Sequence, residues 1–436
     1  MPGQRSHWRL VRQGAGVALA LPALFAATPV FAASGETAGH VSWLLTASAL
    51  VLFMTLPGLA LFYGGLLHAK NLLSIMMQCF AICCIGSLLW VAVGYSLAFD
   101  GTGSLLGGFG KLFLANLSDS YGATAIPENV FALFQMTFAI ITPALIVGAY
   151  PERVNFPFVL AFSALWLLLV YAPVTHWMWG GGWLAALGAL DFAGGVVVHT
   201  TAGVSALLLA ILVGRRKGFP SHMAPPHSPG LTMMGAGMLW VGWFGFNGGS
   251  ALAADGSAAS VIIATHLAAA AGALTWIGAE WFKIGKPTSI GIATGCIAGL
   301  ATITPMAGYV GPAGAMMVGT IGAAVCFGAT LFVKHRLEID DSLDVFAVHG
   351  VGGMLGSVLL PVFAQKALGG AGLPTPFLAM LGVQVLAVAV TAAWSLAISF
   401  GLARLLAPIT PLRVGAEEEF DGLDLATHGE RAYEHA

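Results

Sequence analysis

Charged side chains are scarce in this chain. Only 8% of the 436 residues are charged, whereas 58% are hydrophobic, and the mean hydropathy is +0.87. A soluble globular domain carries about 25% charged residues, so this composition excludes an ordinary soluble domain. The formal net charge is −2, which gives no reason to expect nucleic acid as a partner. The composition predicts an all-α protein that crosses a membrane many times.

Cysteine is also rare, and all five cysteines fall within apolar stretches. Cys79, Cys83 and Cys84 lie on one uncharged stretch without a neighbouring His or carboxylate, so they lack the ligand spacing of a zinc site. We interpret the cysteines as small packed thiols. The sequence predicts no metal and no cofactor.

The first 33 residues differ from the remainder. Arg5, Arg9 and Arg12 precede an apolar run at 15–31, and small residues follow at 32–34. This order is typical of a secretory signal peptide, which we assign to 1–33. Its cleavage would leave the mature N-terminus outside the cell; the alternative is a retained extra helix.

Long uncharged stretches account for most of the chain. A membrane span needs about 20 apolar residues. The stretch 287–333 is too long for one helix, and its Pro and Gly residues near 304–312 divide it into two. We therefore predict eleven spans in a transport domain at 41–408. They are expected at 41–67, 71–99, 130–150, 154–174, 192–214, 229–254, 256–279, two within 287–333, 345–365 and 376–403.

The loop charges predict the orientation. With the N-terminus outside, Lys and Arg gather in the loops on the cytoplasmic side, as the positive-inside rule requires. The tail at 409–436 then lies in the cytoplasm; its acidic composition fits either a disordered segment or a docking site for a partner. Eleven basic residues fall inside and two, Lys111 and Lys366, outside; the inside set is Lys70, Arg153, Arg215, Arg216, Lys217, Lys283, Lys286, Lys334, Arg336, Arg404 and Arg413.

Two stretches 150 residues apart repeat one pattern. Asp191 precedes His199 by eight residues, and Asp341 precedes His349 by the same interval. An ionisable group within an apolar span marks a functional site by default, because burying it in hydrocarbon is costly. The fifth and tenth predicted spans run in opposite directions, which predicts two five-helix halves as an inverted repeat, plus a final helix, with a site near the midplane.

The histidine pair and the aromatic residues allow several chemistries. Facing imidazoles can bind a small neutral molecule, pass a proton, or ligate a metal or haem. Asp191 is expected to cap its helix, with a possible second role toward a cation. Aromatic residues such as Phe138 and Trp179 near span ends fit either an interfacial belt or a cation cage, and Ser250 adds a hydroxyl on the same side.

Several longer motifs stand out along the chain. They are FQMTF at 134–138, WGGG at 179–182, DFAGG at 191–195 with His199, GWFGFN at 242–247 with Ser250, DVFAVHG at 344–350 and GLDLATHGE at 422–430. Together these motifs resemble those of bacterial ammonium transporters of the Amt family, within the Amt/Mep/Rh superfamily. The resemblance extends from about residue 43 into the tail. One departure is Ala347, where the family usually has glycine, and another is Val196, where threonine is common.

The resemblance implies an ammonium transporter of the cytoplasmic membrane rather than an enzyme, assembled as a homotrimer with one pore per subunit. It implies an outer ammonium site formed by Phe138, Trp179 and Ser250. It also implies that a P-II-type nitrogen-signalling protein binds the cytoplasmic face and the tail. The remaining implied roles are a gate formed by Phe138 and Phe246, a pore centre at His199 and His349, a pore lining that includes Trp243, and support of the outer site by Asp191.

Three alternatives stay open at this point. A neutral gas channel of the Rhesus type shares the histidine pair, although Trp179 and Ser250 favour a cation site. An ammonium sensor would normally carry a signalling domain, for which the tail is short. An electron carrier would hold haem between His199 and His349.

Overall fold

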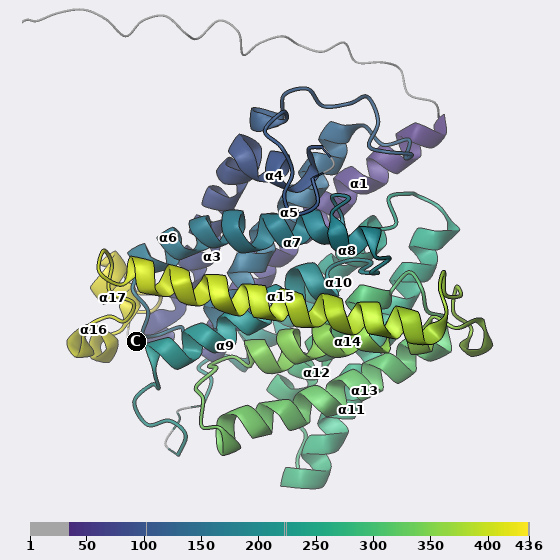
Figure 1. Ribbon diagram of the computed structural model, residues 1–436. Helices are drawn as coiled ribbons and strands as arrows, with labels where there is room; N and C mark the ends of the chain where they lie inside the picture. Colours follow the sequence, from purple (N-terminus) through teal and green to yellow (C-terminus); the bar gives the residue numbers. More distant parts are fainter. Residues whose placement is uncertain (1–34, 102, 222, 224, 435–436) are drawn as a thin grey trace, which may run out of the picture.

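Figure 1 shows the computed structural model of the chain, which describes residues 35–434 except 102, 222 and 224. The predicted signal peptide at 1–33 lies outside these residues. The described chain is helical, and its β-type pairing is limited to one isolated bridge between Val154 and Arg413. The all-α prediction is confirmed.

The helices follow one another along the chain, with two longer connections at 100–127 and 214–228. The α-helices are α1 (Gly35–Phe53), α2 (Ala60–Leu66), α3 (Leu72–Leu89), α4 (Tyr95–Phe99), α5 (Glu128–Ile146), α6 (Phe156–Trp166), α7 (Ala172–Met178), α8 (Trp183–Ala186), α9 (Thr201–Val213), α10 (Pro229–Gly249), α11 (Gly256–Ile284), α12 (Ser289–Ile303), α13 (Pro312–Leu331), α14 (Val351–Phe363), α15 (Phe377–Leu406), α16 (Ala416–Asp421) and α17 (Leu423–His428). Short 3-10 turns occur at η2 (Ala69–Asn71), η4 (Leu112–Leu114), η5 (Val147–Ala149), η8 (Thr304–Met306) and η11 (Lys366–Leu368). The π-helical turns are η1 (Met54–Leu59), η3 (Trp90–Gly94), η6 (Leu167–Tyr171), η7 (Gly195–Thr200), η9 (Phe332–Arg336) and η10 (Phe346–Gly350).

Ten helical stretches of the described chain are long and apolar enough to cross a membrane. The helix α10, which we expected as the sixth span, is not among the ten. It has 21 residues, but it is rich in glycine, which lowers its hydropathy. The chain is a multi-pass membrane protein, and the count of eleven spans stays a prediction.

Two of the π-helical turns carry the two histidines. His199 lies in η7 and His349 in η10. Such turns often occur at functional sites, because they displace side chains from the regular helical positions. The segment η7 packs against α14, and η10 packs against α9. Each histidine is therefore held against the helix that follows the other.

Glycine is required where these segments cross. A Cβ on Gly203 would lie 2.2 Å from the Cα of Gly350, and one on Gly353 would lie 2.5 Å from the Cβ of His199. Both glycines follow a histidine by four residues. Small residues allow membrane helices to approach closely, and here they set the distance between the two imidazoles.

The fourth helical stretch defines two ends of the bundle. Arg153 precedes it and Trp179 lies toward its other end, so we refer to the Arg153 end and the Trp179 end. The long helix α15 runs along the bundle over α9 and α14 (Figure 1). The segment that carries His199 begins at the Trp179 end. The segment that carries His349 begins at the Arg153 end, where Ser342 N–H donates to the carbonyl of Ala149.

The Arg153 end is held by buried charges. The side chain of Arg153 is fully buried and donates to the carbonyl of Asp340, 2.7 Å away, and to the hydroxyl of Ser342. Arg216 pairs with Asp340 at 2.9 Å and with Glu152 at 3.2 Å. Pairing is needed here because an isolated buried charge is strongly destabilising. The network fixes the loops from which the His349 segment starts.

The tail folds onto this end. Helix α17 packs against α3 and the η2 turn before it, and α16 packs against α17; Figure 1 shows both helices together at one end of the bundle. The carboxylate of Asp424 accepts hydrogen bonds from the N–H groups of Leu73 at 3.0 Å and Ser74 at 2.7 Å, so the tail caps α3. The interpretation of the tail as a disordered segment is wrong. The docking of Asp424 onto α3 explains why an acidic composition did not keep the tail unfolded.

Candidate functional site

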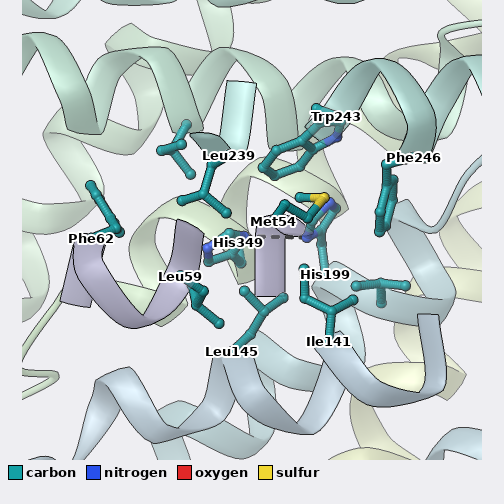
Figure 2. Close-up of a pocket in the computed structure, with 12 residues that line it drawn as sticks. Met54, Leu59, Phe62, Ile141, Leu145, His199, Leu239, Trp243, Phe246 and His349 are labelled. Atoms are coloured by element: carbon teal, nitrogen blue, oxygen red, sulfur yellow. Dashed lines mark hydrogen bonds between the residues drawn. The ribbon is translucent and has the colours of Figure 1, made fainter. Parts of the chain in front are cut away.

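The two histidines meet in the middle of the bundle. Figure 2 shows their rings side by side, and the Nδ1 atoms of His199 and His349 lie 3.2 Å apart. The ring centroids are 5.2 Å apart with a tilt of 19°. One Nδ1 must donate and the other accept, so the two neutral rings are held in complementary tautomers. The Nε2 of His199 is buried without a partner and is free to hydrogen-bond a small molecule.

The space beside the pair is narrow and apolar. It leaves about 10 Å³ for the centre of a water-sized molecule, which is room for roughly one such molecule. Apart from the imidazoles, its walls are hydrocarbon, the indole of Trp243 and the thioether of Met54 (Figure 2). The lining residues are Met54, Leu59, Phe62, Ile141, Leu145, Val198, His199, Leu239, Trp243, Phe246, Ile297 and His349.

Two phenyl rings, tilted by 30° to each other, lie at the side of this cavity that faces the Trp179 end. The rings of Phe138 and Phe246 have centroids 4.2 Å apart, and both side chains are buried. Phe246 in turn stacks on His199 at 6.2 Å. Trp243 flanks His199 at 5.6 Å, and its indole N–H donates to the hydroxyl of Thr304 at 2.9 Å. The two phenyl rings therefore lie between Trp179 and His199.

An open vestibule lies beyond the rings. Its volume is about 380 Å³. The indole of Trp179 meets Phe138 edge to face at 5.9 Å, and the hydroxyl of Ser250 donates to the carbonyl of Phe246 at 2.8 Å. The lone pairs of Ser250 therefore stay available to a donor. The vestibule is lined by Tyr121, Phe131, Phe134, Gln135, Met178, Trp179, Asp191, Phe192, Ser250, Leu252 and Tyr309.

Asp191 joins the vestibule to the His199 segment. Its carboxylate accepts four backbone hydrogen bonds at 2.7–2.9 Å, from the N–H groups of residues 194–197. Burial raises the pKa of Asp191, and the four N–H groups oppose that rise. The side chain is a helix cap, and it places a carboxylate in the wall of the vestibule.

The corresponding residues at the Arg153 end act similarly. Asp341 accepts from the N–H groups of Val345 at 3.1 Å and Phe346 at 2.7 Å. Burial, followed by the charge of Asp344, raises the pKa of Asp341 to about 7. Asp344 itself pairs with Lys334 at 2.7 Å.

The structure brings together every site residue that the sequence indicated, in the order Trp179, Phe138, Phe246, His199 and His349. It adds residues that sequence reasoning missed. Tyr121 and Tyr309 lie in connecting segments, where no hydrophobic period marks them. Thr304 lies at the predicted helix break near 304–312, and a polar residue within an apolar stretch is a signal that could have indicated it.

The geometry leaves no place for haem. Two nitrogens on opposite sides of one metal ion lie about 4 Å apart, with the metal between them. The Nδ1 atoms here are 3.2 Å apart and in mutual contact, and the cavity has no room for a porphyrin. Within residues 35–434, apart from the three that are not described, no group of three or more His, Cys, Asp or Glu side chains is placed to hold a metal ion.

The sequence matches a known protein family over most of its length. Residues 42–433 match the model of the Ammonium Transporter Family. The chain belongs to this ammonium transporter family. It is 44% identical to an ammonium transporter of Bacillus subtilis, over 88% of this chain and 96% of that protein. It is also 44% identical to ammonium transporter Amt1 of Archaeoglobus fulgidus, over 91% of this chain and 99% of the relative.

Solved structures agree with this membership in the ammonium transporter family. The crystal structure of Saccharomyces cerevisiae Mep2 superimposes with a TM-score of 0.80 at 34% identity, over 87% of this chain and 90% of Mep2. A structure described as a sensor Amt protein gives a TM-score of 0.84 at 31% identity, over 90% and 98% of the two chains. The fold is therefore that of Amt and Mep proteins, which form a family of transporters and not of enzymes.

Proposed function

We propose that this protein conducts ammonium across the membrane as ammonia plus a proton, through a pore with an outer cation site and a twin-histidine centre. One observation carries the proposal: the vestibule, the paired phenyl rings and the histidines lie in sequence along one path, as Figure 2 illustrates for its inner part. The vestibule is open and partly polar, whereas the cavity beside the histidines is narrow and apolar, and only two aromatic rings lie between them.

The outer cation site consists of Trp179, Phe138 and Ser250. Ring faces attract cations, and the hydroxyl of Ser250 keeps lone pairs for an N–H donor. Asp191 supports the site with its carboxylate in the same wall. Each feature favours ammonium over neutral ammonia at the mouth.

The narrow cavity favours the neutral form. Carrying an unpaired charge into an apolar space costs many kcal/mol, so ammonium gives up its proton before or at the Phe138–Phe246 gate. Ammonia then passes Trp243 and the histidines, where Nε2 of His199 lacks any other partner. The proton moves separately: Nε2 of His199 accepts it, the Nδ1 proton of His199 passes to Nδ1 of His349, and His349 releases its own Nε2 proton, so that one positive charge crosses and transport is electrogenic.

We extend the proposal to topology. Helix α10 serves as the sixth of eleven spans, and the crossing of η7 with α14 and of η10 with α9 supports two five-helix halves in inverted orientation. The Trp179 end faces outward and the Arg153 end faces the cytoplasm, where most loop Lys and Arg residues lie. The protein then resides in the cytoplasmic membrane with its C-terminus inside.

A homotrimer is the proposed assembly. His266 is exposed on α11, eleven residues into that span, and its ring lies 5.2 Å from the indole of Trp240. An imidazole on the lipid-facing surface of a span is costly, so a neighbouring subunit is expected to cover it. At the cytoplasmic face, the folded tail and its exposed Phe420 offer a docking surface for a P-II-type signalling protein.

The decisive experiment is an ammonium jump on purified protein in liposomes, with potassium as the control. A transient current specific to ammonium would support electrogenic transport. No current, together with faster alkalinisation of the lumen, would indicate neutral ammonia passage as in a Rhesus-type channel. No response in either measurement would contradict conduction and favour an ammonium sensor.

A further inference from the structure

The segment 100–127 folds over the Trp179 end and is attached on two sides. On the α5 side, the carboxylate of Glu128 pairs with Lys111 and accepts from the hydroxyl of Tyr95 at 2.6 Å and the N–H of Ser118 at 2.7 Å. Glu128 is almost fully buried, so these bonds replace its lost hydration. The segment is therefore anchored to the start of α5, ten residues before Phe138.

On the other side, the segment is bonded to the helices that flank Trp179. The indole N–H of Trp177 donates to the carbonyl of Leu105 at 2.8 Å, and the N–H of Trp183 donates to the carbonyl of Ser104 at 3.0 Å. The segment thus connects α5, which carries one gate ring, to the turn between α7 and α8, which carries Trp179.

Tyr121 is the residue of this segment that reaches the vestibule. Its ring stacks on Phe131 with centroids 3.5 Å apart and a tilt of 9°, and it meets Phe99 edge to face at 6.0 Å. Its hydroxyl donates to the backbone carbonyl of Trp179 at 3.4 Å. Burial, followed by the charge of Glu128, raises the pKa of Tyr121 to about 12, so the hydroxyl keeps its proton at physiological pH.

We propose that Tyr121 is a positioning and specificity-determining residue of the outer cation site. Its hydroxyl fixes the backbone of Trp179, so the indole keeps its edge-to-face contact with Phe138. Its ring, held on Phe131, occupies part of the wall of the vestibule, which Asp191 and Ser250 also line. The inference rests on the proposed function, because it assigns a role within the site where ammonium binds.

The two effects separate in two variants. Tyr121→Phe keeps the ring and removes only the hydroxyl, whereas Tyr121→Leu removes the ring and keeps an apolar side chain that preserves folding. Loss of one neutral hydrogen bond corresponds to about a 2–10-fold weakening. We therefore expect Tyr121→Phe to raise the half-saturating ammonium concentration about 3-fold, with the maximal current within about 2-fold of the wild type.

Tyr121→Leu tests the ring. We expect the half-saturating ammonium concentration to rise further, by about 10-fold, because both the hydrogen bond and the aromatic contact are lost. Methylammonium, which is one methyl group larger, should gain relative to ammonium, since the vestibule is wider. The measurement is the current in liposomes over a range of ammonium and methylammonium concentrations, together with the melting temperature of each variant.

The matched control is Phe109→Ala, in the same segment. Phe109 is 66% exposed and does not line the vestibule. The half-saturating ammonium concentration and the selectivity of Phe109→Ala should therefore match those of the wild type. An equal fall in maximal current without a change in half-saturation or selectivity would overturn the inference, as would wild-type values in both Tyr121 variants. Either result leaves the wild-type current intact, whereas a wild type without ammonium response contradicts the proposed function itself.

Discussion

In the segment that carries His199, Asp191 accepts four backbone hydrogen bonds, whereas in the segment that carries His349, Asp341 accepts two. Both segments otherwise use the same parts: an Asp eight residues before the histidine, a π-helical turn and a glycine four residues after it. The first opens onto a vestibule of about 380 Å³, and the second lies over the buried ion pairs of Arg153. One local arrangement thus serves both the Trp179 end, which has a vestibule, and the Arg153 end, which is held by buried charges.

The position five residues before each histidine sharpens this contrast. Gly194 has φ of 120°, and Asp344 has φ of 60°. The first value is open mainly to glycine, whereas the second lies in the left-handed region, which Asp tolerates. At the Arg153 end, the side chain at this position, Asp344, also forms the salt bridge with Lys334. At the Trp179 end, Gly194 has no side chain at this position.

Removing the histidines should have the largest effect. We predict that His199→Leu and His349→Leu each lower the ammonium current more than about 100-fold, because either change breaks the proton path between the rings. The measurement is the transient current in liposomes, with Leu239→Met, a lining residue without a polar group, as the control. An undiminished current in both histidine variants would contradict the proposed proton transfer through the two histidines.

Removing the two Asp caps should lower the unfolding free energy by different amounts at the two ends. Asp191→Ala leaves four buried N–H groups without an acceptor and Asp341→Ala leaves two, so we expect losses of unfolding free energy of about 4 and about 2 kcal/mol. Asp255→Ala is the control, since Asp255 caps the exposed start of α11, where water can replace the lost acceptor, and its loss should be the smallest of the three. Thermal or denaturant unfolding in detergent measures all three. Equal losses at Asp191 and Asp341 would remove the distinction between the ends.

Filling the crossing glycines should affect both segments alike. Gly203→Ala and Gly353→Ala each force a Cβ into the other segment, and overpacking of this kind costs about 1–3 kcal/mol. The distance between the imidazoles should also increase, with a smaller current. Gly237→Ala on α10 is the control, because a Cβ there meets nothing within 4 Å. A crossing variant as stable and as active as Gly237→Ala would contradict the close contact.

The smallest expected effect is a pH dependence of stability that arises from Asp341 at the Arg153 end. The pKa of Asp341 is raised to about 7, against about 3.9 in an unfolded chain, so the native state holds its proton more tightly. The stability that this proton contributes is complete below pH 4 and is lost as the pH rises through 7. Between pH 5 and pH 8, the melting temperature of the wild type should therefore fall relative to that of Asp341→Asn. A constant difference would show that Asp341 does not titrate there.

Much of this arrangement could be predicted from the sequence. Apolar length identified nearly all the helices, and the rarity of charge made His199, His349 and Asp191 conspicuous. The π-helical turns and the pairing of Tyr121 with Trp179 could not be predicted, because they depend on contacts between segments far apart in the chain. The folded tail was missed for the same reason: Asp424 becomes a cap only when α3 is beside it.

The small space beside the histidines has a consequence for the cell's osmotic balance. A cavity with room for about one water-sized molecule, closed by two phenyl rings, cannot hold an unbroken file of water. The membrane can therefore contain many copies of the protein without becoming hydraulically leaky. Vesicles that carry it should shrink no faster than empty ones after a sucrose shock, as stopped-flow light scattering would record.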